Sequence, residues 1–332
     1  MSRAGQLLAT ILFTLNLLTA DAFAADAIEF IALGDMPYSP DQFDSLEYIG
    51  DRIQAGGYPF VVHYGDVKSG REKCSDAVLM KSKKAIYGLL EGRVFYTPGD
   101  NDWTDCDRER AGGFDEMERL ARLREIFYAD RDLPSVAEWR IVRQEPDYRE
   151  NAHWRYGGVQ FVTLHIVGTN NGRRRIMRSD EQAALEAVDA RDRANLAWLD
   201  EAFDKARRDG AEALVAFIHG DPNEFEPWDH RSRPCTVREP VLCNPYLTFL
   251  ERLTRRADAF DKPVLLVHGS TSRFCLDTGF GGWRAKQLWR LNGPGDFVHI
   301  DAAVVRFDPH ARTPFQVHGL LSRNSLPACD PG

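Results

Sequence analysis

Eight apolar runs along the chain predict β-strands, because each is rich in β-branched and aromatic residues and is bounded by Gly, Pro or Asp. These runs cover residues 27–33, 58–64, 93–98, 158–167, 213–219, 262–268, 297–307 and 314–320. Between them, apolar residues recur at helical spacing. That spacing predicts helices over residues 41–56, 75–92, 114–128, 179–210 and 245–260. We expect the helix at 179–210 to begin at a Ser cap and to stop at a Gly.

The alternation of strands and helices predicts an α/β fold built from βαβ units, with helices on the faces of a central sheet. The last two strands have no helix between them, so we expect an antiparallel end to the sheet. No internal repeat or linker is visible, and residues 25–332 are therefore predicted to form one domain. We expect residues 221–245, rich in Pro, Asp and Arg, to form a surface loop.

The net charge of −8 over 332 residues argues against a general nucleic-acid or anionic-membrane binder. Such surfaces need an excess of Lys and Arg. The sequence GRRRIMR at 172–178 is the one local exception. Its arginines are candidates for holding a substrate phosphate, but a solvated basic loop is the simpler interpretation.

The first 24 residues are typical of a secretory signal peptide. A basic Arg3 precedes the apolar stretch 7–18, which is too short to span a bilayer comfortably, and Ala22 and Ala24 fit a cleavage site. An uncleaved anchor is the alternative. We expect cleavage after Ala24 and a mature protein without a membrane segment, located in the periplasm or secreted.

Six cysteines fit an exported protein with disulfide bonds. Six thiols allow 15 pairings, and the sequence does not choose among them. The pairings that we expect are Cys74–Cys106, Cys235–Cys243 and Cys275–Cys329. A cysteine-based metal site is the alternative, but the chain has no C-x-x-C pair.

Five predicted strands end in a glycine beside an Asp, Asn or His. The segments are Gly34-Asp35, Gly65-Asp66, Gly99-Asp100-Asn101-Asp102, His219-Gly220-Asp221 and His268-Gly269-Ser270. Each alone is explained by turn chemistry, in which Asp caps its own backbone. Together they would converge, because ligands of open α/β sheets lie beyond the carboxyl ends of the strands. Carboxylate, amide and imidazole groups suit Mn, Fe or Zn. A bound cation would also relieve the repulsion among the crowded carboxylates.

These strand-end motifs resemble those of the calcineurin-like metallophosphoesterase family. Its successive motifs are D-x-H, G-D-x-x, G-N-H-[DE], a His at a strand end, and G-H-x-H. The sequence PGDNDWTDC at 98–106 looks like an exported bacterial branch of that family. The resemblance extends from about residue 27 to the region of His268. It implies a βαβ sandwich of mixed sheets flanked by helices, and hydrolysis of a small phosphorylated substrate by a metal-activated water.

Position by position, the resemblance implies a set of metal ligands. Asp35 matches a ligand of one metal, and Asp66 matches the aspartate that bridges two. Asn101 and His219 match ligands of the second metal. Asp102 stands where the family has a catalytic histidine, which makes it the candidate to protonate the leaving group.

The departures from the family pattern concern its histidines. Pro37 replaces the histidine of the first motif, with Tyr38 adjacent as a substitute ligand. The last motif is degenerate, because Ser270 and Ser272 stand where two histidines are expected.

His268 lies just before this degenerate motif, and we include it as a further candidate ligand, although a buried structural histidine is the alternative. The sequence thus favours an exported phosphoesterase with one or two divalent ions and an attenuated site. The alternative is an inactive protein of the same fold that binds a ligand or partner.

Overall fold

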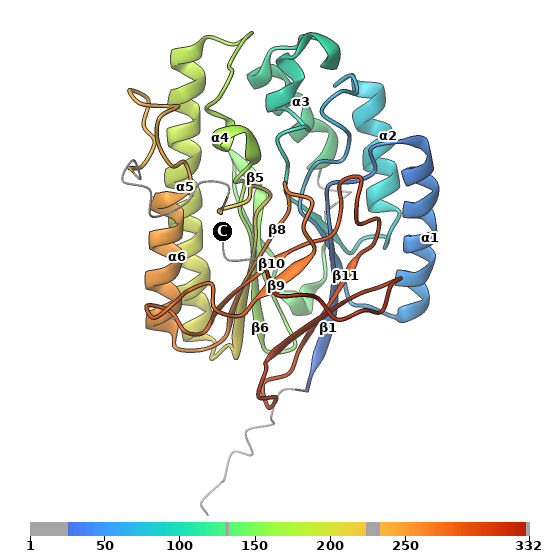
Figure 1. Ribbon diagram of the computed structural model, residues 1–332, viewed down its shortest axis with the longest axis vertical. Helices are drawn as coiled ribbons and strands as arrows, with labels where there is room; N and C mark the ends of the chain where they lie inside the picture. The colour runs from blue at the N-terminus through green and yellow to red at the C-terminus, as the bar shows by residue number, and fades with distance from the viewer. Residues whose placement is uncertain (1–25, 130–132, 224–232, 330–332) are drawn as a thin grey trace, which may run out of the picture.

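Two mixed β-sheets lie face to face in the centre of the molecule, and helices cover the outer face of each (Figure 1). The computed structural model describes residues 26–129, 133–223 and 233–329. The predicted signal peptide, residues 1–24, lies outside the described residues, as does part of the loop predicted at 221–245. The expected α/β class with mixed sheets flanked by helices is confirmed, with two sheets in place of one.

The smaller sheet has five strands in the order β12-β11-β1-β2-β3. Strands β1, β2 and β3 are parallel, whereas β11 pairs antiparallel with both β1 and β12. The expected antiparallel C-terminal pair is therefore confirmed. The strands are β1 (Ile28–Leu33), β2 (Val61–His63), β3 (Val94–Tyr96), β11 (Ala303–Phe307) and β12 (Phe315–Gly319).

The larger sheet has seven strands in the order β4-β5-β6-β7-β8-β10-β9, of which β6, β7, β8 and β10 are parallel. Sequence analysis missed β4, β5, β9 and β10. In β5 the buried positions include Glu150, Asn151 and His153, which hide its apolar pattern. The strands are β4 (Val142–Gln144), β5 (Tyr148–Tyr156), β6 (Val159–Thr163), β7 (Ala213–Phe217), β8 (Val264–His268), β9 (Cys275–Asp277) and β10 (Leu288–Asn292).

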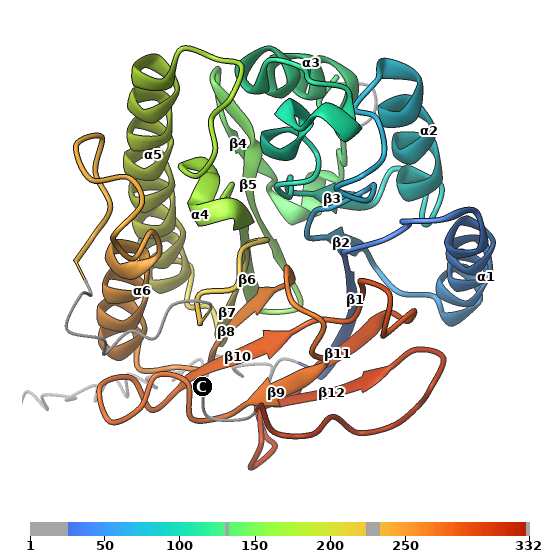
Figure 2. The same ribbon diagram turned by 45° about the horizontal axis from the view of Figure 1, so that its top comes forward.

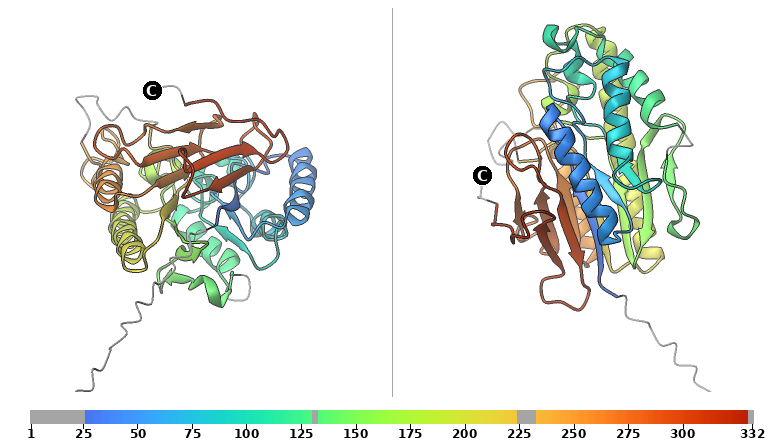
Figure 3. Two further views of the ribbon diagram at one scale, coloured as in Figure 1. Left: turned by 90° about the horizontal axis from the view of Figure 1, so that it is seen from below. Right: turned by 90° about the vertical axis from the view of Figure 1, so that its right-hand side faces the viewer.

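Helices α1 and α2 flank the smaller sheet and α5 and α6 the larger one, as Figures 2 and 3 show from two further directions. The cap of α5 differs from the expectation, since Asp180 rather than Ser179 accepts the hydrogen bond from the N–H of Ala183. A short turn, α4, was not predicted. The helices are α1 (Pro40–Gly56), α2 (Asp76–Tyr87), α3 (Glu116–Phe127), α4 (Gly168–Gly172), α5 (Glu181–Arg208) and α6 (Leu247–Phe260).

Alternate residues of the central strands enter two different cores. In β7, Val215 and Phe217 pack between the sheets, while Leu214 and Ala216 pack beneath α5 and α6. The same alternation in β1 places Phe30 between the sheets and Ile31 beneath α1 and α2. Because both faces of these strands are covered, their sequences are almost uniformly apolar.

Three disulfide bonds join the described cysteines, and they are the expected pairs Cys74–Cys106, Cys235–Cys243 and Cys275–Cys329. They close loops of very different length, with sequence separations of 32, 8 and 54 residues. A search of the described residues finds no helix that is both long and apolar enough to cross a membrane.

Candidate metal centre

Three side chains from both sheets meet beyond the carboxyl ends of their strands. Asp35 follows β1, Asp66 follows β2 and His219 follows β7. One ligand atom from each lies within 4.8 Å of the others. All three residues are at most 4% exposed. The carboxyl ends of strands from both sheets thus bring two carboxylates and an imidazole to one buried point. We call this point the crevice, after the strand-end position at which open α/β sheets bind ligands.

The backbone that presents the two carboxylates is tightly turned. Asp35 and Asp66 have φ angles of +51° and +58°, in the left-handed region that aspartate tolerates better than most residues. Glycines make room for their carboxylates. A Cβ on Gly99 would lie 2.1 Å from Asp66 Oδ1, and a Cβ on Gly269 would lie 2.1 Å from Asp35 Oδ2. Both positions therefore require glycine, because any side chain would clash with the carboxylate of Asp66 or Asp35.

The carboxylates of the cluster are electrostatically frustrated. Burial raises the pKa of Asp35 to about 6, although the charge of His219 opposes the shift. Burial also raises the pKa of Asp66 well above its ordinary value, and the charges of Asp100 and Asp102 add to the rise. Burial lowers the pKa of His219, but the charge of Asp66 and a hydrogen bond to Asp100 raise it well above its usual range overall. The cluster therefore favours a positive charge at its centre.

His219 is oriented as a metal-binding histidine requires. Its Nδ1 lies 3.0 Å from the carbonyl oxygen of Tyr64, which fixes the proton on Nδ1 and leaves Nε2 facing the carboxylates. Nε2 lies 2.9 Å from Asp100 Oδ1 and 3.4 Å from Asp66 Oδ1. Asp100 was not a predicted site residue, yet it is the direct partner of the histidine.

Tyr38 and Asn101 close the side of the cluster formed by the smaller sheet. The Tyr38 hydroxyl donates to Asp66 Oδ2 at 2.9 Å and lies 3.3 Å from Asp35 Oδ1. The Asn101 backbone N–H donates to Asp66 Oδ1 at 2.9 Å, and its side-chain amide nitrogen donates to Asp66 Oδ2. Asn101 thus lies beside the predicted ligands, but its amide must turn its oxygen toward an ion to act as one.

Asp102 points away from the crevice. Its fully buried carboxylate accepts hydrogen bonds from the backbone N–H groups of Asp66 (2.9 Å), Val67 (2.8 Å) and Gly99 (2.7 Å). It also accepts one from the Tyr96 hydroxyl at 2.7 Å. The side chain is thus an acceptor with four donors around it, and it holds the turns that carry Asp66 and Gly99. Its assignment as a general acid stays a prediction.

The remaining acidic residues of this stretch have partners of their own. Asp105 Oδ2 pairs with Arg108 Nη2 at 2.6 Å. Lys68 is fully buried nearby, where burial lowers its pKa and the charges of Asp102 and Asp66 oppose that shift. The carboxylates crowded in residues 100–105 are therefore divided among different cationic and backbone partners rather than gathered at one point.

His268, the further candidate ligand, lies outside the group formed by Asp35, Asp66 and His219. In β8, Leu265 and Val267 pack between the sheets, so that the period of two sends His268 to the face covered by helices. There its Nδ1 lies 2.9 Å from the carbonyl oxygen of Gly269, and its Nε2 lies 3.8 Å from Asp221. Burial lowers the pKa of His268 to about 4, which keeps it neutral.

The two serines of the degenerate motif contribute no side-chain ligand. Ser270 acts through its backbone, whose N–H lies 3.2 and 3.1 Å from the two carboxylate oxygens of Asp35. The Ser272 hydroxyl donates to Asp296 instead. Thr271 between them donates to Asp221 at 2.9 Å and accepts from Asn292 at 2.6 Å. The loop thus positions Asp35 but adds no metal-binding atom.

The turn α4 lies against the cluster and was not recognised in the sequence. Thr169, Asn170 and Asn171 have φ angles of +50°, +58° and +54°, so three consecutive non-glycine residues are left-handed before Gly172 at +75°. Such conformations cost of order 1 kcal/mol each and persist where their surroundings hold them. Thr169 Oγ1 donates to Asp100 Oδ2 at 2.6 Å. The repeated asparagines of GTNNG, which tolerate this region, were the available signal.

The donor set fits one divalent ion. Asp35, Asp66 and His219 offer two carboxylates and an imidazole nitrogen, which is a common set for a catalytic transition-metal site with open positions. The raised carboxylate pKa values are the expected response of such a set without a cation. A second ion would need ligands from Asn101 and further groups, and among the described residues no second cluster of this kind is found.

No protein-family model matches the sequence, and a search of curated proteins finds no match. Solved structures with a similar arrangement include GAP50, the anchor in the inner membrane complex of Plasmodium, with 12% identity and a TM-score of 0.49 over 92% of this chain and 90% of that one. Haemophilus influenzae NAD nucleotidase (NadN) has 10% identity and a TM-score of 0.41 over 92% of this chain and 54% of that one. Thermus thermophilus SoxB, a sulfate thiohydrolase, has 18% identity and a TM-score of 0.36 over 86% of this chain and 43% of that one. These likenesses are distant, and the chemistry proposed for the crevice rests on its own side chains.

Proposed function

We propose that the protein is a metal-dependent phosphoesterase that hydrolyses a small phosphorylated substrate at the crevice. The observation that carries this proposal is the convergence of Asp35, Asp66 and His219 within 4.8 Å at a buried strand-end position. The resemblance of the strand-end motifs to calcineurin-like metallophosphoesterases supports the same reaction. A divalent ion bound there would supply a Lewis acid that polarises a phosphoryl oxygen and makes water nucleophilic near neutral pH.

The chain's own residues would then have distinct duties. Asp35, Asp66 and His219 hold the ion, and Tyr38 donates a hydrogen bond to Asp66 at its edge. The carbonyl oxygen of Tyr64 orients the imidazole of His219 through Nδ1, and Asp100 lies beside Nε2, on the side where the ion would bind. We assign Asp102 a positioning role in place of the general acid, because its carboxylate is already surrounded by four donors.

We further propose that the protein is exported and belongs to the exported bacterial branch that its PGDNDWTDC motif resembles. Three disulfide bonds support this proposal, because they persist in oxidising compartments. The signal-peptide pattern of residues 1–24 supports it from the sequence side.

An inactive binding protein is the second candidate, and two observations favour it. Lys68 is fully buried and lies near Asp66 and Asp102, so that part of the carboxylate charge is balanced without any ion. The metal-ligand set also lacks the histidines of the first and last motifs, at Pro37, Ser270 and Ser272.

Metal retention separates the two candidates. The purified protein would be incubated with Mn, Fe or Zn, desalted and analysed by elemental mass spectrometry, together with its rate of p-nitrophenyl phosphate hydrolysis. We expect about one ion per chain in the unmodified protein and none in Asp66→Asn. Asp200→Asn is the matched control, because it removes a half-buried carboxylate that pairs with Arg252 and Arg256 between α5 and α6, away from the cluster. An ion that survives in Asp66→Asn contradicts the site, and a retained ion without hydrolysis favours the binding protein.

A further inference from the structure

The basic run at 172–178 contains arginines with two different environments. Arg173 is 4% exposed and pairs with Asp189 at 2.7 Å and with Asp192 at 2.5 Å. Arg174 and Arg175 are exposed, and within the described part of the chain neither side chain has an ion pair or a hydrogen bond. The first arginine is therefore a structural anchor, whereas the next two offer free guanidinium groups.

The turn α4, which precedes these arginines, is hydrogen-bonded to Asp100, the partner of His219. The backbone N–H of Arg174 donates to the carbonyl oxygen of Thr169 at 3.3 Å. Thr169 Oγ1 in turn donates to Asp100 Oδ2 at 2.6 Å, and Asp100 Oδ1 contacts His219 Nε2 at 2.9 Å. The main chain of Arg174 is thus three hydrogen bonds away from the imidazole proposed to hold the ion, and Arg175 follows it directly in the chain.

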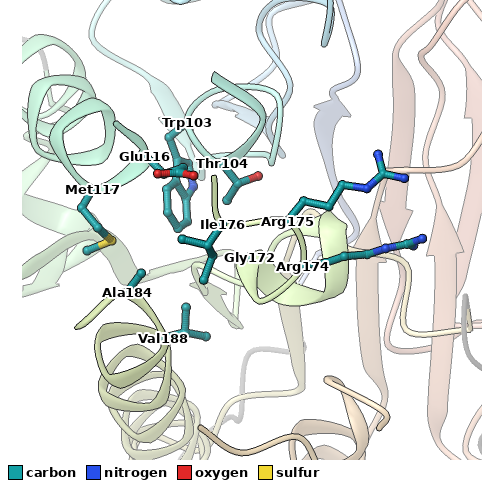
Figure 4. A pocket seen from close by; sticks show the side chains of 10 residues that line it. All are labelled: Trp103, Thr104, Glu116, Met117, Gly172, Arg174, Arg175, Ile176, Ala184 and Val188. Carbon is teal, nitrogen blue, oxygen red and sulfur yellow. The ribbon is translucent and has the colours of Figure 1, made fainter. Parts of the chain in front are cut away.

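The guanidinium groups of Arg174 and Arg175 both extend away from the small cavity beside α4. Figure 4 shows a small cavity next to α4, lined by Trp103, Met117, Val188 and other residues, with Arg174 and Arg175 at its rim. Their guanidinium groups extend away from the cavity, on the side opposite Met117 and Val188. The cavity encloses only about 10 Å³, space for one water at most, so it is not where the arginines bind a ligand.

The turn holds its strained shape through several anchors. Asn171 donates to Asp192 at 2.8 Å and accepts from Arg191 at 2.9 Å, and the Asn170 side chain donates to the carbonyl oxygen of Pro240. A turn of consecutive left-handed residues is maintained only where its surroundings over-determine it, and such turns occur preferentially at functional sites. These hydrogen bonds fix the backbone position of Arg174 and Arg175 relative to Asp100, so only the side chains of the two arginines are free to move.

We propose that Arg174 and Arg175 form a subsite for a second anionic group of the substrate, so that the substrate is a phosphoester with a further phosphate, such as a nucleoside diphosphate. This inference rests on the proposed function of the neighbouring metal centre. Two adjacent guanidinium groups bind phosphate oxygens through charge-assisted, bidentate hydrogen bonds. The chain carries a net charge of −8, and its crevice is acidic, so a polyanionic substrate requires such a local cationic contact.

The test compares two substrates in two matched double variants. Ion-loaded protein would be assayed for kcat/KM with adenosine 5′-diphosphate and with p-nitrophenyl phosphate, which lacks a second phosphate. We expect R174Q/R175Q to lower kcat/KM about 30-fold for the diphosphate, through lost charge-assisted hydrogen bonds, and less than about threefold for the monophosphate. The control R110Q/R178Q removes the same charge from two other exposed arginines and should leave both values within about twofold.

The outcomes separate this subsite from the proposed function. Equal losses on both substrates, or no loss on either, overturn the subsite. If the unmodified protein hydrolyses neither substrate, the proposed function fails, and the subsite is decided by calorimetric binding of inorganic pyrophosphate to metal-free protein. We then expect R174Q/R175Q to bind pyrophosphate about tenfold more weakly than the unmodified protein and the control. Equal pyrophosphate affinity in all three proteins overturns the subsite independently of catalysis.

Discussion

Replacement of Asp102 by Asn is the most informative perturbation of the loops around the metal centre. In the structure, Oδ2 of Asp102 accepts from the N–H groups of Asp66 and Gly99 and from the Tyr96 hydroxyl, while Oδ1 accepts from the N–H of Val67. An amide has only one carbonyl oxygen. If that oxygen takes the place of Oδ2, the NH₂ group faces the Val67 N–H, and two buried donors confront each other.

The magnitude follows from these two donors. Each unsatisfied buried donor costs about 1–3 kcal/mol, so the two donors of Asp102→Asn should lower the free energy of unfolding by about 2–6 kcal/mol. Loss of the negative charge also removes a partner of the buried Lys68 ammonium. A domain is stable by only about 5–15 kcal/mol in total, and the loss is therefore large.

Urea denaturation with an unchanged m value would measure this loss. Asp44→Asn on the exposed face of α1 is the control and should change the free energy of unfolding by less than about 0.5 kcal/mol. Tyr96→Phe removes one of the four donors and should cost about 1 kcal/mol, less in the Asp102→Asn background because the two residues are coupled. If Asp102→Asn keeps full stability and loses only hydrolysis, the positioning role of Asp102 is refuted. That result would favour Asp102 as the general acid.

Two further predictions concern backbone approach and pH. Gly269→Ala should abolish metal retention, because its Cβ would lie 2.1 Å from Asp35 Oδ2, whereas Gly279→Ala, whose nearest neighbour would lie at 3.7 Å, should retain the ion in the same elemental assay. Burial and a hydrogen bond to Glu116 raise the pKa of Asp107 from 3.8 to about 8, so the folded state alone holds this proton between those values and should lose stability as pH rises toward 8. Asp107→Asn keeps a donor toward Glu116 and should flatten the unfolding free energy between pH 5 and pH 8; an unchanged slope would contradict this account.

The sequence predicted which polar residues lie at the strand ends, but it did not predict the orientation of each side chain. Apolar runs that end in Gly-Asp or at a histidine indicated the positions of Asp35, Asp66 and His219, because parallel strands end at one edge. The orientation of His268 was not predictable in the same way. Its strand VLLVH is buried on both faces and is uniformly apolar, so the sequence contains no alternation that tells which face the last residue takes.

The remaining omissions depend on contacts between segments far apart in the chain. Asp102 accepts hydrogen bonds from the backbone N–H groups of Asp66 and Val67, which follow β2 and lie 36 and 35 residues from it along the chain. No local sequence pattern indicates partners at that distance. Strand β5 buries Asn151 because Asn195 of α5 accepts its amide hydrogen bond. Tertiary partners of this kind override the hydrophobic pattern, which is the only signal that a single sequence gives for burial.

The balance of charge at the crevice favours one ion over two. The carboxylates of Asp35, Asp66, Asp100, Asp102 and Asp105 supply five negative charges if all are ionised, and Lys68 and Arg108 supply two positive ones. Once His219 is neutral and bound to an ion, three negative charges remain uncompensated by the protein. One divalent ion leaves a single negative charge, whereas two ions would leave a net positive site with too few ligands, since among the described residues one group of three is found. A mononuclear centre with an adjacent arginine pair would therefore meet an anionic substrate with cationic contacts from Arg174 and Arg175 rather than from a second metal ion.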